Sequence, residues 1–299
     1  MSADPLEISE VNDDTWTFCY QCGLKVDRTA ETIADLLESQ NVTWSINNYR
    51  ADVLLFKERI AQYTPGHIIN KLIEISKKSG RSYLNLIGEP VEYTPLGWTF
   101  NAKQMTLSVA PGNKFKRFYF SSVWADPEIE SWQDRLGDVV YIGRPTPERI
   151  KRVAFFIQQG IDLDIYSQQA WPFAQWKGFI EGGIPGEHAL LKKYKFRLVI
   201  ENSYTHLYHS EKLFNTLRAG VVPFYLCDPA LDVPFIKDLY IQPTRENLAI
   251  RKDIAPALLA NINDFMFSKK WEMYSIKNQY LQILEFARSI ADVRAATAP

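Results

Sequence analysis

The chain has 299 residues, which is enough for two domains of ordinary size. Hydrophobic residues make up 46% of it and charged residues 23%, a balance typical of an ordered globular protein. The formal net charge of -1 leaves no global field that would draw the chain to nucleic acid or to an anionic membrane. We therefore expect no nucleic-acid partner.

The sequence shows no targeting or membrane-spanning pattern. Its first residues are acidic and polar, unlike a signal peptide, and no apolar run approaches a membrane-spanning length. Three cysteines in a chain of this length favour a reducing compartment. Cys19 and Cys22 have C-x-x-C spacing in an apolar, strand-like run without a second ligand pair, so we interpret them as buried thiols. We expect a cytoplasmic protein, and peripheral association with a membrane stays open.

The first half of the chain alternates between strand-like and helix-like segments. Helical periodicity marks 29–39 and 65–78. Strand-like segments are 16–22, 42–46, 53–56, 84–87, 105–109 and 118–123, of which the last is also compatible with a helical or irregular structure. This alternation predicts an α/β domain with a mostly parallel sheet.

A polar, acidic segment separates the two halves, and we place the domain boundary near residue 136, giving domains 1–136 and 137–299. The second half repeats the alternation with a strand at 139–142, a helix at 147–159, a strand at 161–166, a strand-helix-strand unit at 194–226, and helices at 245–262 and 269–293. The pattern predicts two Rossmann-like domains with a ligand cleft between them and a helical C-terminus. No G-x-G-x-x-G or P-loop motif is present, which disfavours a standard dinucleotide or P-loop site.

The most informative segment is the strand-helix-strand unit at 194–226. Its first apolar strand runs into a polar stretch at 201–203, Ser210 can cap the helix that follows, and Gly220 ends it. Polar residues at the carboxyl end of a strand lie where open α/β sheets bind ligands. The helix start favours an anion, yet Lys212 places a cation there. Spacing alone is also compatible with an ordinary capped helix that carries a solvated Glu-Lys pair.

These residues resemble the donor-binding motif of the α1,3-fucosyltransferase family. The matching residues are Lys195-Phe196, Glu201-Asn202-Ser203, Tyr208, Glu211-Lys212 and Gly220-Val221-Val222-Pro223. Ile200 replaces an aromatic residue of the motif, and Ser210 stands where Thr is usual, which keeps the capping hydroxyl. The strong match is confined to this segment.

The resemblance implies a fold of GT-B type, in which two Rossmann-like domains face each other across a cleft, with the acceptor side first and the nucleotide-sugar side second. It also implies an inverting transfer of fucose from GDP-fucose to an acceptor glycan, without a metal or another cofactor. A different GDP-sugar donor and a non-catalytic glycan- or nucleotide-binding relative are the alternatives. The chain shows no C-terminal heptads, which is compatible with a monomer.

The resemblance assigns the donor contacts to Asn202, Tyr208, Glu211 and Lys212. Lys212 would offset the charge of the departing diphosphate, and Glu211 would accept hydrogen bonds from sugar hydroxyls. Asn202 and Tyr208 would supply further polar groups beside them. The orientation of the nearby Arg197 is left undecided by strand alternation.

A second cation for the diphosphate is expected from the helix at 147–159. Arg152, which precedes a pair of phenylalanines, fits the family pattern best, with Arg149 and then the loop residue Arg144 as alternatives. No metal is expected, because Asp162 and Asp164 form a D-x-D pair on one face of a strand that we interpret as structural.

An inverting transfer also needs a base that accepts the proton of the acceptor hydroxyl. We choose Glu89, which follows the strand at 84–87 and has small residues or proline beside it, as in the family. Glu92 is the alternative.

Overall fold

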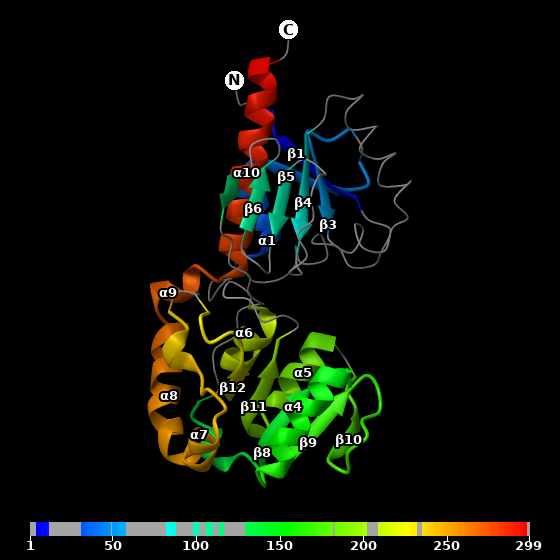
Figure 1. Ribbon diagram of the computed structural model, residues 1–299. Helices are drawn as coiled ribbons and strands as arrows, with labels where there is room; N and C mark the ends of the chain where they lie inside the picture. The colour runs from blue at the N-terminus through cyan, green and yellow to red at the C-terminus, as the bar shows by residue number, and fades with distance from the viewer. Residues whose placement is uncertain are drawn as a thin grey trace. The chain divides into compact units, whose positions relative to one another are not determined.

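Figure 1 shows the computed structural model of the chain. The described residues are 4–11, 31–48, 50–57, 82–87, 98–101, 106–109, 114–116, 129–181, 183–201, 209–231 and 235–297. The chain divides into two compact units, one made of Met1–Trp124 with Glu272–Pro299 and the other of Ala125–Trp271. Each unit contains one sheet with helices, so the predicted α/β class is confirmed. None of the described helices is both long and apolar enough to cross a membrane.

Seven described strands of the first unit form one sheet with the order β2-β1-β3-β4-β5-β6-β7. They are β1 (Leu6–Val11), β2 (Val42–Ile46), β3 (Val53–Lys57), β4 (Ser82–Ile87), β5 (Trp98–Asn101), β6 (Thr106–Val109) and β7 (Lys114–Lys116). Neighbours from β2 to β5 are parallel and the last two pairings are antiparallel, so the sheet is mostly parallel, as predicted. The segments predicted at 16–22, 65–78 and 118–123 lie outside the described residues.

The strand β1 lies between β2 and β3, although no strand was predicted there. Its acidic character suggests exposure, yet Glu10 is only 1% exposed and both Ile8 and Ser9 are fully buried. The Ser9 hydroxyl accepts a hydrogen bond from the Asn48 N–H at 2.8 Å. A polar strand can occupy the interior of the sheet when its polar groups find such partners.

The long helix α10 (Ile276–Thr297) belongs to the first unit. Its buried residues Tyr280, Ile283, Leu284, Ala287 and Ile290 share a core with α1 (Ile33–Ser39) and with Ile8, Val53 and Leu55 of the sheet. Our prediction instead placed the terminal helices in a domain 137–299, with the boundary near residue 136. The structure differs because the apolar face of α10 completes the core of the first unit. Along the chain, the first unit ends at Trp124 and resumes at Glu272.

Five described strands of the second unit form a fully parallel sheet with the order β10-β9-β8-β11-β12. They are β8 (Gly137–Ile142), β9 (Leu163–Ser167), β10 (Trp176–Phe179), β11 (Tyr194–Ile200) and β12 (Val222–Leu226). Ile241 extends the sheet by a parallel bridge to Phe224. This strand order is that of a Rossmann-type sheet.

Helices cover both faces of the second sheet. One face packs against α4 (Pro147–Gln158), α7 (Arg245–Ala249) and α8 (Arg251–Met266). The other face packs against α5 (Gly183–Leu191) and the end of α6 (Glu211–Arg218). The helix predicted at 245–262 is divided into α7 and α8, and the one predicted at 269–293 is divided into α9 (Lys269–Glu272) and α10. Neither β10 nor α5 was predicted.

Candidate functional site

The strand order of the second unit reverses between β8 and β11, which are neighbours in the sheet. From β8 the chain moves outward to β9 and β10, whereas from β11 it moves outward to β12. Open α/β sheets bind ligands at the carboxyl ends of the strands that flank such a reversal. The helices that follow these two strands are α4 and α6, and their first turns are therefore the expected site.

The helix α6 has the boundaries that the sequence predicts. Ser210 is its N-cap, and the Ser210 hydroxyl accepts a hydrogen bond from the Lys212 N–H at 3.3 Å. The helix ends at Arg218, and Gly220 follows with a φ of 62°, a left-handed conformation that glycine adopts without steric strain. The predicted cap and the predicted stop are both confirmed.

Glu201, the first residue after β11, places a fully buried carboxylate at the start of α6. Its Oε1 accepts hydrogen bonds from the Ser210 N–H at 2.9 Å and from the Tyr225 hydroxyl at 2.8 Å. Its Oε2 accepts one from the Ser210 hydroxyl at 2.7 Å. These donors and the helix dipole compensate the buried negative charge. The start of α6, where an external anion was expected, therefore already holds an internal one.

Lys212 lies in the first turn of α6, and its side chain is 20% exposed. Its Nζ lies 3.1 Å from the Ser210 hydroxyl and 3.5 Å from Oε2 of Glu201. The unusual cation at this helix start is thus explained in part by Glu201, without a ligand. Its partial exposure leaves the ammonium reachable by an anion from solvent.

Two departures from the family motif have little effect on this edge. Ile200, which replaces an aromatic residue, is 2% exposed and packs in the core between the sheet and the helices α4, α7 and α8. Ser210 keeps the capping hydroxyl. Glu211, half-buried in the first turn of α6, is well placed for the helix dipole, and its predicted contact with sugar hydroxyls stays a prediction.

The two arginines of α4 differ in their position relative to the carboxyl edge. Arg149 lies in the first turn of α4. Burial of Tyr141 raises the pKa of its hydroxyl to about 12, and the nearby positive charge of Arg149 acts in the opposite direction. Arg152 lies about one turn further along, and two of its nitrogens are each 3.0 Å from Oε1 of Glu148. Arg149, the alternative named from the sequence, therefore lies closer to the carboxyl edge than Arg152, and the assignment of either arginine to a diphosphate stays a prediction. Arg144 is exposed in the loop before α4.

Arg197 fixes the first turn of α6 from inside the unit. Its side chain is 2% exposed and pairs with Oε1 of Glu187, on α5, at 2.8 Å. The same guanidinium donates to the Thr216 hydroxyl at 3.2 Å and to the Lys212 carbonyl at 3.4 Å. Its orientation, undecided from the sequence, is thus toward α5 and α6, and its charge is used within the fold.

Several predicted site residues lie outside the described residues. Asn202 and Tyr208 belong to the connection between Glu201 and α6, and Glu89 and Glu92 follow β4 in the chain. Their assigned roles stay predictions.

Two residues of the edge had no predicted role, Glu201 and Tyr225. Glu201 was part of the motif match, and Tyr225 lies in an apolar strand where a tyrosine suggests core packing. The signal that links them is the strand register, because Tyr225 is paired with Val199. Glu201 comes two positions after Val199, so both polar groups project from the same face of the sheet.

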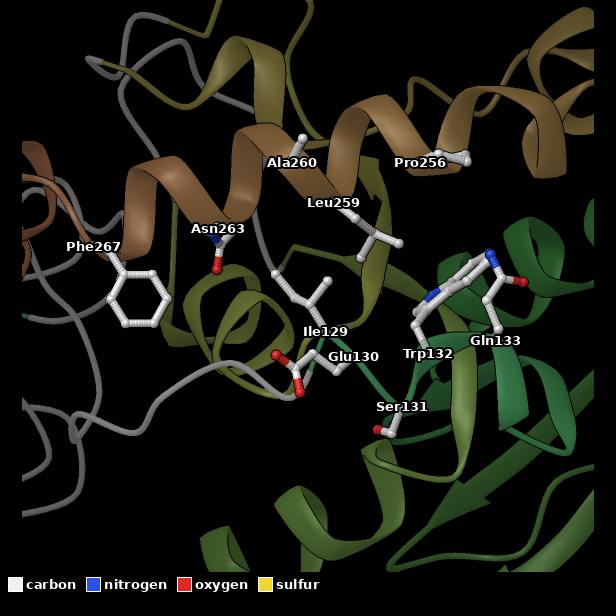
Figure 2. Close-up of a pocket in the computed structure, with 10 residues that line it drawn as sticks. All are labelled: Ile129, Glu130, Ser131, Trp132, Gln133, Pro256, Leu259, Ala260, Asn263 and Phe267. Atoms are coloured by element: carbon white, nitrogen blue, oxygen red, sulfur yellow. The ribbon is translucent and has the colours of Figure 1, made fainter.

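Two hollows in the described part of the second unit contain none of the predicted donor residues. The larger, of about 850 Å³, lies between residues 129–133 and α8, with Leu259 and Asn263 on the helix and Phe267 directly after its end (Figure 2). The smaller, of about 540 Å³, includes Asp162 and Asp164. Asp164 accepts a hydrogen bond from the Tyr194 hydroxyl at 2.7 Å and pairs with Lys177 at 3.2 Å. These contacts agree with a structural role for Asp164.

Known structures with a similar fold are crystal structures of α1,3-fucosyltransferases. One gives a TM-score of 0.52 and another, with GDP-fucose, gives 0.56, each at 12% sequence identity. Each comparison covers 97% of this chain and 91% of the other. The chain has the fold of α1,3-fucosyltransferases. The predicted resemblance and the predicted GT-B type are confirmed at the level of the fold, whereas no protein-family model and no curated protein matches the sequence.

Proposed function

We propose that the chain is a glycosyltransferase that transfers fucose from GDP-fucose to a hydroxyl of an acceptor glycan. The observation that carries the proposal is the polar edge after β11, where the partly exposed ammonium of Lys212 lies at the start of α6. The fold shared with a fucosyltransferase structure containing GDP-fucose supports the choice of donor.

In the proposed reaction, cations stabilise the departing GDP. When the bond between the sugar and the phosphate oxygen breaks, negative charge grows on the diphosphate, and preorganised positive groups stabilise it. Lys212, in the first turn of α6, supplies one such group, and Arg149 supplies another from α4. We include no metal ion in the mechanism, because these groups can offset the charge of the diphosphate.

The proposed transfer inverts the anomeric carbon. The acceptor hydroxyl attacks from the side opposite to GDP, and a carboxylate accepts its proton. We assign this base to Glu89, which comes two positions after the end of β4, with Glu92 as the alternative. Asn202, Tyr208 and Glu211 are assigned to the polar contacts of the donor.

A panel of nucleotide sugars tests this proposal. GDP-fucose, GDP-mannose and UDP-galactose are incubated with the protein in EDTA, and release of the nucleoside diphosphate is measured. We expect release from GDP-fucose to be fastest and to be lost in Lys212→Ala. Lys252→Ala, which changes an exposed lysine in the first turn of α8, should retain it.

The other outcomes separate the alternatives. Faster release from GDP-mannose would assign a different GDP-sugar, and release from UDP-galactose alone would contradict a GDP-dependent enzyme. Binding of GDP without any release, and without change in Glu89→Gln, would indicate a non-catalytic relative.

A further inference from the structure

Among the described residues, the buried Glu201 carboxylate has four hydrogen-bond donors, and the distances to them differ. The Ser210 hydroxyl, the Ser210 N–H and the Tyr225 hydroxyl lie 2.7, 2.9 and 2.8 Å from its oxygens. The Lys212 ammonium lies 3.5 Å away, at the long limit of a hydrogen bond. Lys212 thus makes the longest of the four contacts.

We propose that Glu201 is a positioning residue that holds the Lys212 ammonium before a ligand binds and releases it to an incoming diphosphate, with Tyr225 making the release possible. The inference rests on the proposed function in one respect, namely that the ligand at this edge carries a diphosphate. It assigns to Glu201 and Tyr225 a role in setting the affinity of the site.

The two members of the ion pair differ in exposure and in the number of short hydrogen bonds that hold them. The Glu201 side chain is 0% exposed and is held by groups from the α6 cap and from β12, whereas the Lys212 side chain is 20% exposed. Lysine carries its charge on a flexible stem with four carbons, so the ammonium can turn away while the helix stays in place. Glu201 cannot follow it without breaking three shorter hydrogen bonds.

Departure of Lys212 does not leave the buried carboxylate without partners. A buried charge that loses its compensation is strongly destabilising, and this cost would oppose release. Here two hydroxyls and one N–H remain on the carboxylate when the ammonium leaves. Tyr225 supplies one of these three, so the ease of release depends on its hydroxyl.

The Tyr225 hydroxyl can be removed without emptying the core. The Tyr225 ring is fully buried and packs edge-on against the Tyr240 ring, with centroids 5.2 Å apart. Phenylalanine keeps this ring contact and removes the hydroxyl that donates to Glu201. The carboxylate then depends more on Lys212, which should be held more tightly and be less available to a diphosphate.

A matched control exists at the other end of β11. The Tyr194 hydroxyl also donates to a carboxylate, that of Asp164, at 2.7 Å. Tyr194 begins β11 and Glu201 follows its end, so about 20 Å of strand separates them. Tyr194→Phe therefore removes the same kind of hydrogen bond far from Lys212.

The test is a double-mutant cycle with two probes, inorganic pyrophosphate and GDP, measured by calorimetry without divalent metal. We expect Tyr225→Phe to weaken the binding of both probes roughly three- to tenfold, because part of the free energy of one charge-assisted hydrogen bond is lost from ligand binding. The effect should vanish in the Lys212→Met background, and Tyr194→Phe should leave both affinities unchanged. A purely structural role of Tyr225 would lower the melting temperature and weaken binding equally in both Lys212 backgrounds.

The outcomes separate this inference from the proposed function. If pyrophosphate shows the coupling and GDP does not bind, the inference holds and the GDP-sugar assignment fails. If GDP binds and Tyr225→Phe has no effect, or the same effect with Lys212 and with Met at position 212, the inference is overturned and the proposed function stands. If neither probe binds to the wild type, both are overturned.

Discussion

The Ser210 hydroxyl donates to the buried Glu201 carboxylate at 2.7 Å, although the two residues are nine positions apart in the chain. The same hydroxyl accepts from the Lys212 N–H at 3.3 Å. One side chain thus caps α6 and satisfies a buried charge at the end of β11. The position of Lys212 at this edge depends on both contacts.

Removal of the Ser210 hydroxyl should lower the free energy of unfolding by more than the loss of an ordinary helix cap does. We expect Ser210→Ala to lower the free energy of unfolding by about 2–4 kcal/mol, because the cap and a hydrogen bond to a buried charge are lost together. Thr146→Ala, which removes the cap of α4 at an exposed position, should cost only about 1 kcal/mol. Urea denaturation measures both values, and equal costs would contradict the dual role of Ser210. Ser210→Thr should retain most of the stability.

The ion pair between Arg197 and Glu187 should contribute to stability far more than the one between Arg152 and Glu148. Arg197 is 2% exposed, and Glu187→Gln would leave its buried charge poorly compensated. We expect a loss of about 2–3 kcal/mol, since Glu187 itself is 23% exposed and partly screened by solvent. Glu148→Gln, which breaks an exposed pair, should cost less than about 0.5 kcal/mol. Similar losses in chemical denaturation would contradict this difference.

Cys227 should be unreactive in the folded protein. Burial raises the pKa of its thiol from 9.0 to about 11, so about one thiol in a thousand is ionised at pH 8. Mass spectrometry after iodoacetamide treatment should find the Cys227 peptide unmodified at pH 8 and modified after unfolding in urea. Fast modification of the native protein would contradict the burial of this thiol.

The same pKa shift predicts the sign of a pH effect on stability. Because the folded-state pKa is above that of an unfolded thiol, the stabilisation from Cys227 is present below about pH 9 and is lost as the pH rises toward 11. Unfolding free energies of the wild type and Cys227→Ala, measured between pH 8 and 11, should therefore converge as the pH rises.

The arginines of α4 can be ranked by their effect on GDP affinity. We expect Arg149→Ala to weaken GDP binding by about tenfold or more, because Arg149 lies in the first turn at the carboxyl edge. Arg152→Ala should change it less than about threefold, since Arg152 is paired with Glu148 one turn away. The opposite ranking in a calorimetric titration would restore the assignment made from the sequence.

Local signals predicted the second unit well. Apolar runs, a capping serine and a glycine stop placed β11, α6 and β12 to within a residue or so, because each boundary depends on nearby residues. Long-range contacts were harder to predict. Nothing local marks α10 as part of the first unit, since its amphipathic face would fit either core.

At the candidate site, too, local patterns predicted single residues but not the contacts between distant residues. The motif identified Lys212, whereas the ion pair that Lys212 makes with Glu201 requires the fold. The choice between Arg149 and Arg152 also depends on where the first turn of α4 meets the sheet edge. The polar strand β1 was missed because burial of Ser9 and Glu10 contradicts their usual preference for solvent.

The most direct test of the donor assignment is the thermal stability of the protein with GDP and with UDP, in EDTA. At about one hundred times its Kd, a nucleotide should stabilise the fold by about 2.7 kcal/mol, which corresponds to a rise in Tm of roughly 5 °C. We predict this rise for GDP, little or none for UDP, and loss of most of it in Lys212→Ala. A rise with UDP and none with GDP would contradict the assignment of the site to a GDP-sugar.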